Sequence, residues 1–555
     1  MSHFALSLNV NFLEATSEMW KLHLDNRNCT SVDLVTAYLK RIEKDNIHGA
    51  AIRAIIETDD RADIFALAQE LVEERKGGKI RGPLHGIPID NIAIRGKLKT
   101  TTGSKVLHAS VVARDSTVVA KLRKAGLIII GKAILSEWCN YRASGVLPNA
   151  WSGTGGLGLS PFNPGLDPSG SSSGSASAIA AGFIPLAIGS ETDGSLICPS
   201  SRAGIWALKP TVGLISRAGI IPVSLNQDSP GPMAKNVKDI ALLLNALVGP
   251  DEADPASIGA SSGRRSDYTA FLTPNFEGLR VGVMNPEWFM SDQNIPYDAK
   301  YIIESTLSAL KRMEDAGAVV KNPVNLPTLD EMLAFNPSDV QHLDFKEGLK
   351  SYLANLESSD IHTLEDVMQW NYEHLQKDFE SQITFEEVLE WAKKDISAHD
   401  EALSRQLRLS RDNGIDVVLK THDLDILLVP SDAKKATRIS AMAGLLLLLL
   451  LPPLYSVPVS QFLRSWHNLR NQSPSGVHLL YEQCTNVSSA SLGYPVANLP
   501  LGIQPNGLPF GLAIFAGRFR EDLLLRAMSA FEALYPDTAS PEAFKRDASW
   551  PPVVS

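Results

Sequence analysis

The sequence predicts a single large α/β domain, and two observations support that prediction. Segments of helical and of strand-like periodicity alternate along the chain, and no linker of domain size separates them. The chain has 555 residues, of which 44% are hydrophobic, so it can bury a large core. Length alone would allow about two to four domains, but the unbroken alternation favours one.

In the first half of the chain, apolar spacing predicts helices and strands in turn. Thr30 and Asp33 can cap a helix whose apolar face holds Val32, Val35, Leu39 and Ile42. The expected elements that follow are a strand at 51–56, a helix at 118–125, a strand at 127–131, a short helix and a buried strand within 176–188, and a helix at 237–247.

The second half continues the alternation around a helical insert. Residues 322–411 are richer in charged and aromatic residues and show helical periodicity with little strand signal. The remaining expected elements are strands at 279–284, 425–429, 494–501 and 510–515, and helices at 297–316 and 521–534.

The most informative segment is rich in serine and glycine and spans residues 168–200. Two small-residue clusters, 169–175 and 192–195, flank an aliphatic run at 176–188. A flexible linker would not alternate with runs of helix and strand length. Glycines beside serines let backbone N–H groups approach a developing oxyanion, which is what acyl transfer needs. The segment therefore predicts an active site on two loops.

The same segment resembles the core of the amidase signature family, and in particular its fungal members. The matching words are SGSSSGS at 169–175 and ETDGSLICP at 191–199. The resemblance implies one amidase domain over residues 1–555, built on a mixed, twisted central sheet with helices on both faces. It also implies that the insert at 322–411 covers the substrate channel. Further landmarks follow in family order: GPLHGIP at 82–88, TTGS at 101–104, AGLIIIGKAILSEW at 125–138, ALKPTVGLISRAGIIP at 207–222 and QDSPGPM at 227–233.

The resemblance also implies roles for individual residues. The acyl-enzyme nucleophile falls on Ser195, and the bridging serine, which follows a cis peptide bond in the family, falls on Ser171. The backbone N–H groups of Thr192, Asp193 and Gly194 would form the oxyanion hole. In the family a neutral lysine accepts the proton of the bridging serine, which deprotonates the nucleophile.

That lysine is missing here. Where the family strand reads roughly G-[IV]-P-x-x-x-K-D-N, this chain passes from Pro88 through Ile89 directly to Asp90 and Asn91, so that three residues are absent. Lys97, Lys99 and Lys105 follow soon after and are the candidates to replace the base. Without a replacement, a loss of about 10⁴ to 10⁶ in turnover is expected. A true deletion and a gene-model error both remain open.

A second departure is the run of leucines at 445–451, followed by Pro452 and Pro453. It is too short to span a membrane, and the prolines would break a helix there. Residues 445–492 form an atypical insertion, either a surface insertion of this chain or a translated intron.

Other motifs favour ordinary structure over function. Residues 170–174 fit G-x-S-x-G with Ser172 as nucleophile, but the preceding Pro-rich stretch cannot be a central strand. Residues 153–158 fit G-x-G-x-x-G without a preceding strand, and the S-x-x-K match at 308–311 lies within an amphipathic helix pattern. His85 is expected to make a structural hydrogen bond.

Composition narrows the class further. A net charge of −10 and the absence of a Lys/Arg block argue against nucleic acid and anionic membranes as partners. Four scattered cysteines, with Cys198 read as a packed apolar residue, and the absence of a secretory signal favour a cytoplasmic protein. No cofactor and no metal site are predicted. A homodimer is left open.

The sequence therefore predicts hydrolysis of a carboxylic amide, with a small-molecule amide as the partner. Water would release the carboxylate from an acyl-Ser195 intermediate after ammonia or an amine has left. Two alternatives stay open: an inactive amide-binding pseudoenzyme, because the lysine is absent, and a glutaminase-like component of a tRNA-dependent amidotransferase. The acidic charge and the helical insert weigh against the second alternative.

Overall fold

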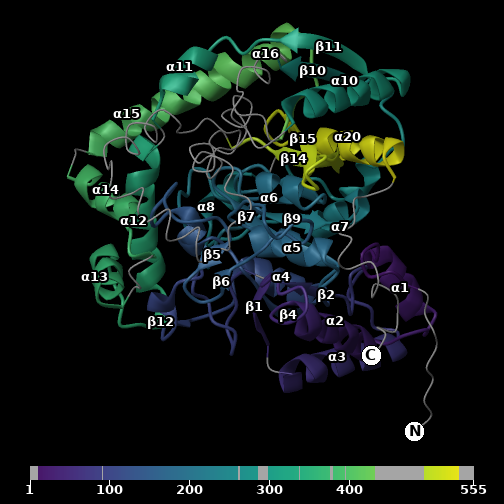
Figure 1. Ribbon diagram of the computed structural model, residues 1–555, viewed down its shortest axis with the longest axis vertical. Helices are drawn as coiled ribbons and strands as arrows, with labels where there is room; N and C mark the ends of the chain where they lie inside the picture. Colours follow the sequence, from purple (N-terminus) through teal and green to yellow (C-terminus); the bar gives the residue numbers. More distant parts are fainter. Residues whose placement is uncertain are drawn as a thin grey trace.

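The chain folds around one mixed sheet that is covered by helices on both faces (Figure 1). In the computed structural model, the described residues are 10–59, 61–90, 92–260, 263–284, 298–336, 338–374, 379–393, 396–431 and 493–536. The leucine run at 445–451, the insertion at 445–492, Cys484 and Asn91 lie outside these residues.

The central sheet has 11 strands among the described residues. Parallel pairs join β4 to β2, β2 to β7, β13 to β10 and β10 to β11, whereas the other neighbours are antiparallel. The strands are, in spatial order, β1 (Ile55–Thr58), β4 (Ile128–Ala133), β2 (Pro88–Asp90), β7 (Leu186–Glu191), β9 (Ser229–Ala234), β8 (Trp206–Lys209), β14 (Val496–Ile503), β15 (Pro509–Ala516), β13 (Ile426–Pro430), β10 (Arg280–Met284) and β11 (Val319–Val324).

Alternate residues of the sheet face two different hydrophobic clusters. Along β13, Ile426 and Leu428 pack into the larger cluster, whereas Leu427 and Val429 pack into a second one. Side chains on a strand point to opposite faces in turn, so this pattern means that both faces are covered. The predicted mixed sheet with helices on both faces is confirmed.

Helices from the first half of the chain, together with α10 and α20 from the second half, supply the larger cluster. They are α1 (Ser17–Asp25), α2 (Ser31–Asp45), α3 (Arg61–Lys76), α4 (Thr117–Lys124), α5 (Ser173–Ala180), α7 (Val237–Leu247), α10 (Ala299–Asp315) and α20 (Glu521–Leu534). The short helices α6 (Ile197–Arg202) and α8 (Pro255–Gly259) follow the serine clusters.

The helical insert forms a separate group of helices along one side of the sheet, away from α1 to α3 (Figure 1). Its helices are α11 (Leu329–Ala334), α12 (Ser338–Ala354), α13 (Leu364–His374), α14 (Ile383–Trp391) and α15 (Ile396–Leu407), and α16 (Asp416–Thr421) follows the insert in the sequence. The expectation of little strand in 322–411 holds except at the end of β11 and at β12 (Leu356–Ser358), which pairs with β3 (Val111–Val112).

Most expected elements are confirmed within two residues, but the strand expected at 51–56 is wrong in its start. That strand covers only Ile55–Thr58, because Ala51 and Arg53 adopt positive φ angles of 52° and 51°. The capping box of Thr30 and Asp33 at the start of α2 is present as expected.

Gly174 allows α5 to pack directly against the ends of β1 and β4. A Cβ atom there would lie 2.4 Å from the Ala54 carbonyl oxygen and 2.4 Å from the Ile134 nitrogen. The Gly174 N–H also donates to the Ile134 carbonyl at 2.9 Å. The position therefore admits no side chain.

We expect Gly174→Ala to lower the free energy of unfolding by about 1–3 kcal/mol, because the overlapping atoms are backbone and must move. Chemical denaturation measures this loss. Gly259→Ala is the matched control, since that glycine is also helical and its Cβ would meet no atom within 4 Å. Equal stabilities of the two variants would contradict the close packing of α5.

Candidate active site

The two serine clusters lie side by side in the fold. Ser171 stands in the loop that leads into α5, and the Gly170–Ser171 peptide bond is cis, as the resemblance implied. The N–H of Ser172 donates to the carbonyl oxygen of Ser195 at 3.1 Å, and the N–H of Ser136 donates to that of Ser171 at 3.1 Å. The segment that carries Ser171 thus contacts both the end of β4 and the turn that carries Ser195.

Residues 192–195 form a tight turn between β7 and α6, and a buried carboxylate lies behind it. Glu191 accepts hydrogen bonds from the N–H groups of Leu196 at 2.8 Å and Ile197 at 3.1 Å. Burial raises the pKa of Glu191, and the positive charge of Lys209 together with backbone N–H groups, that of Gly194 included, opposes this rise. Gly194 itself has φ 79°, a conformation that suits glycine. These contacts with Glu191 fix the conformation of the turn.

A second carboxylate holds the other side of the turn. The Thr192 hydroxyl donates to Asp228 at 2.6 Å, and the N–H groups of Val223 and Ser224 donate to the other oxygen of Asp228. Burial raises the pKa of Asp228 to about 6, against the effect of these donors. Asp228 therefore ties the turn to the loop at 217–228.

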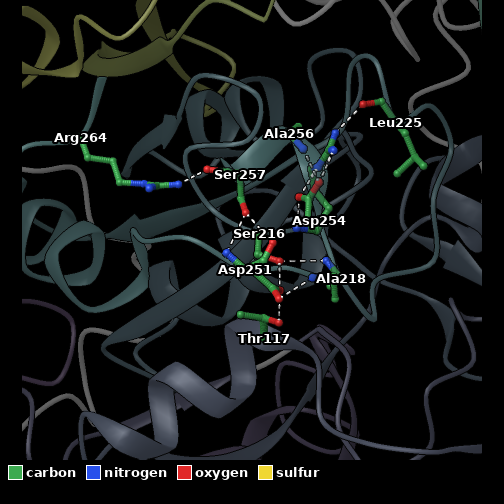
Figure 2. A network of polar contacts seen from close by, with 11 residues as sticks. Thr117, Ser216, Ala218, Leu225, Asp251, Asp254, Ala256, Ser257 and Arg264 are labelled. Atoms are coloured by element: carbon green, nitrogen blue, oxygen red, sulfur yellow. Dashed lines mark hydrogen bonds and ion pairs between the residues drawn. The ribbon is translucent and has the colours of Figure 1, made fainter. Parts of the chain in front are cut away.

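A polar network anchors that loop in turn (Figure 2). Arg217 pairs with Asp254 at 2.6 Å and donates to the Leu225 carbonyl. One oxygen of Asp251 accepts from Ser216 at 2.6 Å and from Thr117 at 2.5 Å. Arg217 and Leu225 line the same smaller hollow as Thr192, and no residue of the network lines the main cavity.

A cavity of about 730 Å³ opens at the first serine cluster. Ser171, Ser172 and Ser175 line one side, and residues of β4 and its continuation line another. Trp370 and His374 of α13 contribute from the helical insert. Ser195 is 5% exposed and is not part of the cavity lining, but its carbonyl oxygen accepts from the N–H of Ser172, which does line the cavity. Thr192 lines a smaller hollow that shares Cys139 and Ser190 with the main cavity.

The short strand β2, where the deletion falls, ends in a buried carboxylate. Asp90 is buried and accepts from the Ser175 hydroxyl at 2.7 Å and from the Ile188 N–H at 3.1 Å. Burial raises the pKa of Asp90 to about 7. No lysine stands on this strand.

The three lysines that the sequence suggested as substitutes occupy different places. Lys97 is 62% exposed and pairs with Asp63 at 3.1 Å, so it does not reach the serines. Lys99 and Lys105 both line the cavity, Lys105 from an exposed position. Sequence reasoning missed a fourth amine, Lys132 in β4, which also lines the cavity and is only 8% exposed.

The competing motifs have structural explanations. The stretch before Ser172 is not a strand, and residues 153–158 lie in a small hairpin of β5 (Trp151–Ser152) and β6 (Gly156–Leu157). The short strand β5 was not expected. A dinucleotide-binding motif would also need a helix directly after it, and no helix follows this hairpin. His85 bonds to the Leu71 carbonyl at 2.9 Å, which confirms its structural role, and Cys198 is a buried free thiol.

Comparison with known proteins agrees with the fold. The amidase family model matches residues 33–525. A Schizosaccharomyces pombe protein assigned to the amidases is 34% identical over 98% of this chain and 89% of its own length. The peptide amidase of Stenotrophomonas maltophilia superposes with a TM-score of 0.79 at 31% identity, covering 95% of this chain and 98% of that chain.

The chain belongs to the amidase family. It is a hydrolase that acts on carboxylic amides. A more distant relative is a glutamyl-tRNA(Gln) amidotransferase component from Caldanaerobacter subterraneus, which is 28% identical over 94% of this chain and 96% of its own length. Within the described residues, no helix is both long and apolar enough to cross a bilayer.

Proposed function

We propose that the chain hydrolyses its amide through an acyl intermediate on Ser195, with Ser171 as the proton relay. The observation that supports this most is the direct contact between the two serine segments, from the Ser172 N–H to the Ser195 carbonyl at 3.1 Å. Ser171 takes the proton of Ser195 while Ser195 Oγ attacks the amide carbonyl, and later delivers a proton to the leaving nitrogen. Water then releases the carboxylate.

The turn at 192–195 supplies the oxyanion stabilisation in this proposal. Glu191 and Asp228 hold the turn from two sides, so its N–H groups need no reorganisation when charge develops on the carbonyl oxygen. The N–H of Gly194 also helps to stabilise the Glu191 carboxylate.

We infer that the substrate is a linear amide with an apolar acyl part. Most of the surface that lines the cavity is apolar, although polar side chains also contribute to it, and an apolar surface favours apolar ligand groups. The insert at 322–411 contributes Trp370 and His374, in keeping with its proposed place over the substrate channel. The apolar lining residues are Ile56, Ile92, Ile134, Leu135, Ile188, Ile220 and Ile221.

The charge of the chain supports a protein that does not bind nucleic acid or anionic lipid. A net charge of −10 provides no basic field for nucleic acid or anionic lipid. Cys29, Cys139 and Cys198 are free thiols, which suits the reducing cytoplasm. A component of an amidotransferase complex remains the second candidate because of the relative at 28% identity, and co-purification with partner proteins would distinguish it.

An activity-based fluorophosphonate probe tests the assignment. We expect one adduct, located on Ser195 by peptide mapping and absent from Ser195→Ala. Ser172→Ala is the matched control, since Ser172 is the nucleophile of the rival G-x-S-x-G reading. Labelling that persists in Ser195→Ala, or disappears only in Ser172→Ala, would show that the nucleophile is a residue other than Ser195.

A further inference from the structure

We propose that Lys132 is the proton acceptor for Ser171, in place of the lysine that this chain lacks. This inference rests on the proposed function, in which Ser171 relays the proton of Ser195. Lys132 and Ser171 line the same cavity, one from β4 and the other from the loop before α5.

The surrounding backbone brings the two elements together. Directly after β4, the N–H of Ser136 donates to the Ser171 carbonyl at 3.1 Å, and the carbonyl of Ile134 accepts from Gly174 at 2.9 Å. The lysine-bearing strand and the serine-bearing loop are therefore held in contact at two points that follow the cis peptide bond. Lys97, in contrast, is exposed and paired with Asp63.

The hydrogen bonds of Lys132 fit a neutral amine. Its Nζ donates to the Ile92 carbonyl at 2.7 Å and to the Thr100 hydroxyl oxygen at 3.2 Å. Thr100 gives its own proton to the Ile94 carbonyl at 3.2 Å, so its oxygen must accept from Lys132. A neutral amine has two N–H groups and one lone pair, whereas an ammonium has three N–H groups. The two acceptors satisfy the neutral form and leave the lone pair available.

The electrostatic surroundings agree. Glu57 lies opposite Lys132 on β1, and the negative charges of Glu57 and of Asp90 on β2 attract its ammonium form, but they do not outweigh the effect of burial. Burial lowers the pKa of Lys132 to about 7, because desolvation disfavours the ammonium. A substantial fraction of the enzyme therefore holds this amine neutral near pH 7.

With Lys132 as the acceptor, every proton that moves during acylation has both a donor and an acceptor. Ser195 Oγ bonds to the carbonyl carbon, its proton passes to Ser171, and the Ser171 proton crosses the cavity to Lys132. When the C–N bond breaks, Lys132 returns a proton through Ser171 to the leaving nitrogen. No other co-reactant is needed, and the expected loss of activity from the missing lysine is correspondingly smaller.

The test compares Lys132→Ala and Lys132→Met with Lys97→Met as the matched control. We expect the acylation rate of both Lys132 variants to fall by about 10²- to 10⁴-fold, the usual contribution of a general base, with amide binding unchanged. Small primary amines, such as propylamine, should restore turnover of Lys132→Ala, with rates that rise with amine basicity. A merely structural role would not give this rescue.

The pH profile of the unmodified chain provides a measurement independent of folding in the variants. We expect kcat/KM to rise with pH through an apparent pKa near 7, since only the neutral amine accepts a proton. Glu57, Asp90, Lys99, Lys105, His108 and His374 also face this cavity or Lys132. The rise of kcat/KM with pH must therefore disappear in Lys132→Met to support the assignment.

Activity of Lys132→Ala within threefold of the parent would overturn the inference, as would loss that follows Lys99→Met or Lys105→Met instead. Absence of the pH limb in the unmodified chain would also overturn it. Fluorophosphonate labelling of Ser195 separates this failure from failure of the proposed function. If Ser195 is labelled while Lys132 proves dispensable, only the choice of proton acceptor is wrong.

Discussion

Ser195→Ala is expected to lower kcat/KM for amide hydrolysis by about 10⁶-fold, as removal of a serine nucleophile does in other hydrolases. The alanine variant keeps the turn at 192–195, because Glu191 holds that turn through backbone N–H groups and not through the Ser195 hydroxyl. The loss should therefore appear in kcat, with substrate affinity nearly unchanged. Steady-state kinetics on an aryl amide measures both.

Ser200→Ala is the control for this experiment. Ser200 is also buried at the start of the same chain segment, and its hydroxyl donates to the Ile197 carbonyl at 2.8 Å. We expect its activity to stay close to that of the parent. A comparable loss in both variants would show that the effect comes from disturbing α6 rather than from the nucleophile.

Ser171→Ala is expected to give the second largest effect, a fall in acylation rate of about 10³-fold or more. The alanine removes the relay between Ser195 and the proton acceptor, and this relay acts in the transition state and not in ground-state binding. The dissociation constant of a competitive amide inhibitor should therefore change by less than about tenfold. Stopped-flow acylation and inhibitor titration measure the two quantities separately.

Ser177→Ala provides the comparison, since Ser177 is buried in α5 and its hydroxyl donates to the Leu159 carbonyl at 3.5 Å. Its acylation rate should match the parent. If Ser171→Ala instead weakened inhibitor binding and left the acylation rate unchanged, Ser171 would be a binding residue and not a relay.

Local signals allowed much of the fold to be predicted. The capping box of Thr30 and Asp33 fixes the start of α2, and the charged first turn and apolar spacing of α20 fix its full extent. The strand at 51–56 was wrong at its start because the bend there depends on distant contacts. The Asn46 side chain bonds to both the N–H and the carbonyl of Ile55, and no local pattern reports this.

The parts of the site that depend on the backbone could be predicted from short sequence motifs. The parts that depend on the burial of a side chain could not. The serine clusters and the turn at 192–195 were located from glycine and serine spacing. Lys132 was missed because the strand expected at 127–131 ended just before it, and its burial arises only when β1, β2 and the loop at 92–100 close around it. The first three lysines after the deletion were the natural candidates, yet Lys97 is exposed.

The central claim is that the amide passes through an ester on Ser195, and trapping that ester tests it most directly. Rapid acid quench during the first turnover of an activated aryl amide, followed by peptide mapping, should place the acyl mass on the peptide that contains Ser195. The same quench of Ser195→Ala should give no adduct. An acyl mass on Ser171, Ser172 or Lys132, or turnover with no covalent adduct at any time, would contradict the account.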